Sequence, residues 1–151
     1  MSGTYDNYFL DTLVVICQES SIFYQEMSER INSLALSSLF REMSRSRACT
    51  KANLEVFQAE LKQTNDCFDD VAGAIISAYH NLKQSLADDG DLKFMERLEE
   101  AETQVLETFR TGIQQVSNPV LAEKLAIHIA TMQLNYDRLK TMKFDLERHP
   151  T

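Results

Sequence analysis

The chain has 151 residues, a net charge of -8 and only four glycines and two prolines among residues that otherwise favour helix. Its length and 44% hydrophobic content suit a single globular domain spanning residues 1–151. The acidic balance argues against a nucleic-acid or anionic-membrane partner, since both need a basic face. Three cysteines without CxxC spacing indicate neither a disulfide framework nor a zinc site. With no basic leader and no long apolar run, the sequence predicts a cytoplasmic all-α protein.

In chain order, apolar residues recur at alternating spacings of three and four, which is typical of helices with one buried face. The first helix, for example, is predicted from the stripe Phe9, Leu13, Ile16, Phe23, Met27 and Ile31. The five predicted ranges are about 5–31, 34–63, 67–87, 92–116 and 119–148.

Polar and glycine residues mark the ends of these helices. Ser33 supplies cap chemistry for the second helix, and Asn118 with Pro119 does so for the fifth. Gly90 is expected to close the third helix and Asp91 to cap the fourth. Gly73, inside the third helix, is expected to allow close approach to a neighbouring helix.

Helix lengths predict the topology. The first, second, fourth and fifth helices each reach roughly 40 Å at 1.5 Å per residue, and short turns join them as two antiparallel hairpins. The shorter third helix can carry the chain back along the bundle. We therefore expect a ferritin-like four-helix bundle with an extra crossover helix.

Glu102 lies inside the apolar stripe of the fourth helix, where a carboxylate needs a partner because burying it alone is costly. Counting outward from the turns at Ser33 and Asn118 places polar residues of four helices at one height. This predicted polar core layer consists of Ser20, Arg47, Glu102 and Asn135, with Tyr136 beside it. We expect Glu102 to pair with Arg47, and Asn135 with Ser20 or Tyr136 to take the remaining hydrogen bonds.

Ferritin-like carboxylate proteins hold two metals at such a height, using a Glu from each of two helices and a Glu-x-x-His from each of the others. This chain has no Glu-x-x-His, and a cation at Arg47 would repel a metal. We therefore expect no metal and no cofactor. If a metal were nevertheless bound, the candidate ligands would be Glu19, Glu102 and His128.

Four segments, LFREMSRSRA, AYHNLKQSL, EEAETQVLETFR and YDRLKTMK, occur in this order along nearly the whole chain. Together they resemble an uncharacterised bacterial family with a rubrerythrin-related, ferritin-like fold. The resemblance implies a five-helix domain with a crossover helix, and an arginine and a glutamate that match Arg47 and Glu102. Where family members tend to carry a tryptophan and a histidine, this chain has Tyr79 and Tyr136.

The sequence favours a non-catalytic helical stress or interaction protein over an enzyme, since it contains no catalytic triad order and no phosphate-binding or dinucleotide motif. The alternative is a metal-binding ferritin-like oxidoreductase with a degenerate carboxylate site. A third reading, a small-ligand site near Tyr24 and Tyr136, also stays open. Val15 and Ile22 lie on the first helix away from the inferred core, where either the third helix or a second copy of the chain covers them. The second case predicts a homo-oligomer, most simply a two-fold dimer.

Overall fold

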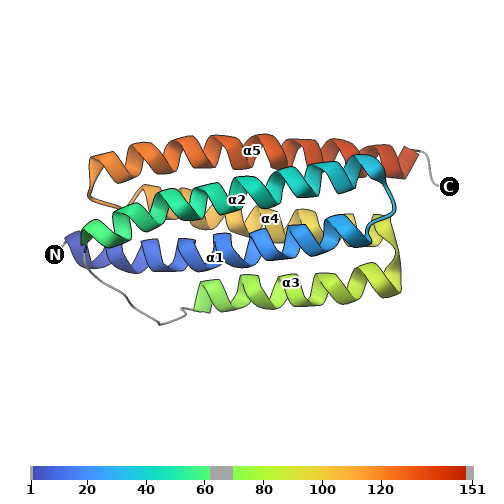
Figure 1. Ribbon diagram of the computed structural model, residues 1–151, viewed down its shortest axis with the longest axis horizontal. Coiled ribbons are helices and arrows are strands. Elements are labelled where there is room, and N and C mark those ends of the chain that lie inside the picture. Colours follow the sequence, from blue (N-terminus) through green and yellow to red (C-terminus); the bar gives the residue numbers. More distant parts are fainter. Residues whose placement is uncertain (1, 62–69, 149–151) are drawn as a thin grey trace.

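The computed structural model describes residues 2–61 and 70–148, and within these ranges the chain forms five α-helices and no strand. The helices are α1 (Ser2–Arg30), α2 (Leu34–Leu61), α3 (Asp70–Asp89), α4 (Asp91–Ile113) and α5 (Pro119–Arg148) (Figure 1). The predicted all-α class is therefore confirmed. The expected end of the second helix at 63 and start of the third at 67 lie outside the described residues.

Two predicted caps are present at helix starts. The Ser33 hydroxyl accepts a hydrogen bond from the Leu36 backbone N–H at 3.2 Å, at the start of α2. The Asn118 side-chain oxygen accepts from the Val120 and Leu121 N–H groups at 2.9 and 3.2 Å, and Pro119 is the first residue of α5. These bonds satisfy backbone donors that have no partner inside the helix.

The turn between α3 and α4 is tighter than predicted, because the single residue Gly90 separates the two helices. Gly90 has φ +86°, a left-handed conformation that costs glycine little, and it occupies the N-cap position expected for Asp91. Asp91 is instead the first helical residue, where its carboxylate still complements the helix dipole. At its other end α4 stops at Ile113 rather than 116, and the Gly112 carbonyl accepts hydrogen bonds from the Gln115 and Val116 N–H groups in the turn that follows.

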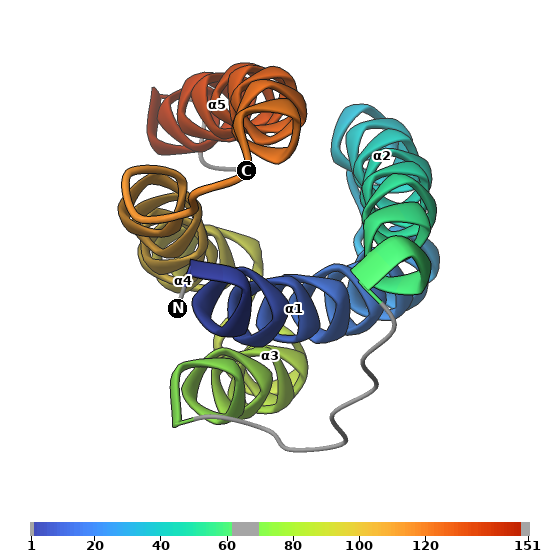
Figure 2. The ribbon, with the colours of Figure 1, turned by 90° about the vertical axis from the view of Figure 1, so that its left-hand side faces the viewer.

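The helices are arranged around α1, which contacts α2, α3 and α4 (Figure 2). Helix α4 also packs against α3 and α5, whereas α2 and α5 meet at fewer points. Chain direction alternates, so that α1, α3 and α5 run one way and α2 and α4 the other (Figure 1). Helix α3 therefore returns the chain along the length of the molecule before α4 begins.

Two contacts tie the start of α1 to the far end of α4. The buried Asp6 carboxylate accepts hydrogen bonds from the backbone N–H groups of Ser117 and Asn118 at 2.9 and 3.0 Å. The Phe9 ring lies directly over Gly112, so that a Cβ added there would come within 1.7 Å of the ring. Gly73, by contrast, has no atom of the described residues within 4 Å of an added Cβ, which contradicts the close helix approach predicted for it.

Every residue of the first predicted stripe is buried in the core. Val15 is half-buried at the edge of the core, and Ile22 is 47% exposed. None of the described helices combines the length and the hydropathy needed to cross a membrane.

Candidate functional site

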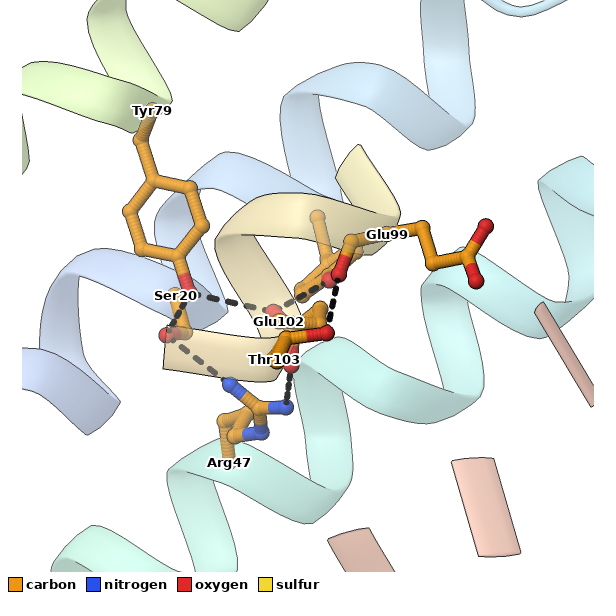
Figure 3. A network of polar contacts seen from close by, with 7 residues as sticks. Ser20, Arg47, Tyr79, Glu99, Glu102 and Thr103 are labelled. Carbon is orange, nitrogen blue, oxygen red and sulfur yellow. Dashed lines mark hydrogen bonds and ion pairs between the residues drawn. The ribbon is translucent and has the colours of Figure 1, made fainter. Parts of the chain in front are cut away.

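Glu102 is the centre of a polar network inside the helical core. It projects from α4 and is only 2% exposed. Its Oε1 accepts hydrogen bonds from the Tyr24 hydroxyl at 2.6 Å and the Tyr79 hydroxyl at 3.2 Å. Its Oε2 accepts from Arg47 Nη2 at 2.5 Å (Figure 3). Because all three partners donate, the carboxylate acts only as an acceptor, as an ionised carboxylate does.

Ser20 closes the network into a ring. Its hydroxyl accepts from Arg47 Nη1 at 3.0 Å and lies 2.6 Å from the Tyr79 hydroxyl (Figure 3). Tyr79 has one hydroxyl hydrogen and donates it to Glu102, so Ser20 is the donor to Tyr79. The hydrogen bonds then run in one direction, from Arg47 through Ser20 and Tyr79 to Glu102. Chains of this kind polarise and strengthen one another.

The ring, together with Tyr24, joins four helices. Ser20 and Tyr24 lie on α1 one turn apart, Arg47 on α2, Tyr79 on α3 and Glu102 on α4. The residues come from segments far apart in sequence, and the network fixes their helices at one relative height. No residue of α5 takes part in the hydrogen bonds given above for this network.

Burial and mutual attraction hold the charges in this network. Burial raises the pKa of Tyr24 and of Tyr79 above the ordinary value, and the Glu102 carboxylate raises both further. Burial lowers the pKa of Arg47, but the combined interactions with Glu102, Tyr79 and Tyr24 outweigh burial, and the net change in its pKa is upward. Both phenols therefore stay neutral donors and Arg47 stays a cation near neutral pH. Burial also raises the pKa of the nearby Cys17 thiol to about 12, so this thiol is unreactive at neutral pH.

Aromatic rings cover the network. Phe23 stacks on Tyr79 with centroids 4.6 Å apart and meets Tyr24 edge-on at 5.1 Å. The Arg47 guanidinium lies 5.7 Å from the centre of the Tyr24 ring, within range of a cation–π interaction. Arg47 Nε is buried and has no hydrogen-bond partner within the described part of the chain. Arg47 and Glu102 therefore lie in apolar surroundings, where either charge without the other would be costly to bury.

Three of the five residues predicted for the polar layer, Ser20, Arg47 and Glu102, thus come together. Asn135 is buried on α5, but no hydrogen bond joins it to Glu102 in the described ranges. Tyr136 is half-buried, and its hydroxyl is hydrogen-bonded to Thr103 at 3.0 Å. The hydrogen bonds to Glu102 Oε1 that were expected from Asn135 or Tyr136 come instead from Tyr24 on α1 and Tyr79 on α3.

The alternative metal ligands are not gathered. His128 Nδ1 lies 3.2 Å from the Thr50 hydroxyl. Burial lowers the pKa of His128, and the nearby positive charge of Lys124 lowers it further. Glu19 is half-buried on α1, and both oxygens of Glu102 are engaged. Within residues 2–61 and 70–148, no three His, Cys, Asp or Glu side chains are close enough to hold a metal ion together. The residues at this height therefore do not fit a dinuclear metal centre.

Tyr24 and Tyr79 were missing from the predicted layer, although the sequence contains a signal for both. Tyr79 occupies the apolar stripe of its helix, and counting outward from Gly90 places it level with residue 101. Tyr24 follows Ser20 by one helical turn on the same face. A tyrosine on a core face needs a partner for its hydroxyl, and Glu102 was the buried acceptor at that level with hydrogen bonds still to be filled.

The fold and the network together define an all-helical protein in which a buried Arg–Glu pair and two tyrosines connect the first four helices. Residues 8–115 match the domain of unknown function DUF2383, and the chain belongs to this family. The matched range contains every residue of the network and ends before α5. No curated protein and no solved structure matches the chain.

Proposed function

We propose that this protein is a ferritin-like four-helix bundle that acts without metal, as a non-catalytic stress or interaction protein of the bacterial cytoplasm. In this proposal α1, α2, α4 and α5 are the bundle and α3 is the crossover helix. The support comes from the alternating helix directions and from the return of the chain through α3. The segments that resemble the rubrerythrin-related family support it as well.

One observation carries the non-catalytic assignment. The Arg47 guanidinium lies 2.5 Å from Glu102 at mid-height of the core, the level at which ferritin-like carboxylate proteins place their metals. A fixed cation in contact with the only buried glutamate of the described core opposes the binding of a second cation there. The network then stabilises and aligns the helices instead of performing chemistry.

Metal analysis tests this assignment against the oxidoreductase alternative. The protein is produced in iron- and manganese-supplemented medium, purified without chelators and analysed by inductively coupled plasma mass spectrometry. We expect far less than one transition-metal ion per chain. The variant Arg47→Met, which frees Glu102 from its cation, serves as the comparison. One or two ions per wild-type chain, lost in Glu102→Gln, would instead assign the oxidoreductase.

We further propose that the outer face of α1 forms a two-fold dimer through Ile22, with Val15 at its edge. Ile22 is 47% exposed in the single chain, although its side chain is large and apolar. Light scattering coupled to size exclusion at tens of micromolar gives the mass. We expect a dimer for the wild type and a monomer for Ile22→Asp. Ile127→Asp on α5, a residue that is 56% exposed, is the matched control and is expected to stay dimeric. A wild-type monomer would exclude this interface.

A further inference from the structure

Two cavities lie side by side along the contact between α3 and α4, apart from the buried network. The first has a volume of about 590 Å³ and is bounded by α1, α3 and α4, with Phe9, Ala74, Ile75 and Gly112 in its wall. The second has a volume of about 550 Å³ and lies between α3 and α4, with Asn81, Asp88 and Glu100 in its wall. Both volumes fall in the range of small-molecule sites.

The two cavities adjoin at Gln104, and we infer that they are the two ends of one surface groove. Gln104 of α4 lines both of them, and small residues of α3, Ala74 at one end and Ala78 at the other, leave the space open. From Arg97 to Gly112 the groove follows about 22 Å of α4 at 1.5 Å per residue. We call it the α3–α4 groove. Its length suits an elongated molecule rather than a compact one.

The ends of the groove differ in polarity. The first cavity, which we call the apolar end, has Phe9, Val71, Ala74 and Ile75 in its wall and a single carboxylate, Glu107. The second, the acidic end, carries Asp88, Asp89 and Glu100. Arg97 is the one cation among the described lining residues of both cavities, and it is paired with Asp89 at 2.9 Å. The charges without an ionic partner in the groove are therefore negative.

We propose that the α3–α4 groove binds an elongated cationic amphiphile, with an apolar tail at the apolar end and a protonated amine at the acidic end. Burial of the tail against Phe9 and Ile75 supplies a non-directional attraction that grows with tail length. The amine can donate to Glu100, which is exposed at the groove, and an ammonium group has three donors. Asp88, nearer the turn at Gly90, adds negative charge to the same end. An anionic head would meet unpaired carboxylates there.

Calorimetric titration with octylamine, hexylamine and octyl sulfate below their micelle concentrations tests the proposal. We expect octylamine to bind one per chain. Shortening the tail by two methylenes should weaken binding, by up to about fourfold for each methylene that is fully buried. Octyl sulfate, which has the same tail, should bind at least about tenfold more weakly because of its charge. Equal affinity for the amine and the sulfate would overturn the proposal.

Variants locate the site. Ala74→Phe fills the apolar end and should abolish binding, whereas Ala48→Phe, at an exposed residue of α2 outside the groove, should not. Glu100→Gln should weaken octylamine binding several-fold, whereas Glu123→Gln, at an exposed residue of α5, should not. Circular dichroism and thermal unfolding establish that the variants are folded.

Three results would overturn the assignment. Equal losses in Glu100→Gln and Glu123→Gln would mean general attraction to an acidic protein. Unchanged binding in Ala74→Phe would place the tail elsewhere. A dimer that Ala74→Phe converts to a monomer, with no amine binding to the wild type, would make the groove an interface with a second copy. The metal analysis is independent of all three outcomes, and the α1 dimer is independent of the first two.

Discussion

Tyr24 and Tyr79 donate to the same oxygen of Glu102, at 2.6 and 3.2 Å, and leave the other oxygen to Arg47. The two phenols thus approach the carboxylate from α1 and α3, and the guanidinium approaches it from α2. This division separates the neutral hydrogen bonds from the ion pair. Each can be removed by substitution without removing the other.

Removal of one member of the ion pair should be more damaging than removal of both. Glu102→Leu leaves the guanidinium of Arg47 buried without its carboxylate, and we expect a loss of about 3–5 kcal/mol in the free energy of unfolding. The double variant Arg47→Met with Glu102→Leu should recover most of this loss. Denaturant unfolding of both single variants and the double variant gives the coupling energy. Small additive losses, each under about 0.5 kcal/mol, would contradict a coupled buried pair.

The buried phenols of Tyr24 and Tyr79 should make the free energy of unfolding fall at alkaline pH. Burial, with Glu102, raises the pKa of Tyr24 and Tyr79 above the ordinary 10. Above that pH the unfolded chain releases phenol protons that the folded chain retains, so the stabilisation is complete below about pH 10 and is lost as pH rises further. Cys17, whose pKa is raised from 9.0 to about 12, adds an effect of the same sign.

Urea unfolding between pH 8 and 11 measures this dependence. We expect a shallower decline in the variant with Tyr24→Phe and Tyr79→Phe, and a further reduction when Cys17→Ala is added. Absorbance at 295 nm supplies a second reading, because the two buried phenols should ionise only when the protein unfolds. Ionisation of all five tyrosines near pH 10 in the folded protein would contradict the burial of these two.

Two glycines should respond to alanine in opposite directions. Gly112→Ala places a Cβ against the Phe9 ring, and we expect a loss of about 1–3 kcal/mol from overpacking. Gly73→Ala adds a methyl group where no atom of residues 2–61 or 70–148 lies within 4 Å, and we expect a gain of about 0.5–1 kcal/mol because alanine loses less backbone entropy in a helix. Thermal unfolding compares them. Phe9→Leu should reduce the loss at Gly112, and equal responses of the two glycines would rule out this explanation.

Asp6 should control the turn between α4 and α5. Its carboxylate accepts from the backbone N–H groups of Ser117 and Asn118, so Asp6→Ala leaves both donors without that partner. We expect a loss of about 1–3 kcal/mol in the free energy of unfolding. Hydrogen exchange at residues 117 and 118 should quicken more than exchange at the middle of α4. Exchange that is unchanged at these two residues would show that Asp6 does not hold the turn.

The sequence predicted well at which level along the helices each polar side chain lies. It predicted less well which neighbouring helix each side chain faces. Counting from a short turn works across Ser33 because α1 and α2 are antiparallel, and it gave the level of Ser20 and Arg47. The same counting set Asn135 near the level of Glu102 but could not say which neighbour faces the carboxylate. The helix that supplies Tyr79 was expected to lie outside the layer. Distances around a bundle depend on how helices pack, which periodicity along one helix does not encode.

The arrangement of the network over α1 to α4 creates two levels of cooperativity. None of these four helices can separate from the others without breaking a hydrogen bond to a buried charge or to its partner. Helix α5 can separate without breaking any of them, although its apolar side chains Leu121, Leu125 and Leu139 are buried. Opening of α5 alone is therefore a partial unfolding reaction that costs less free energy than global unfolding. In the native ensemble, α5 is the helix whose amides should exchange first, while the other four exchange as one cooperative unit.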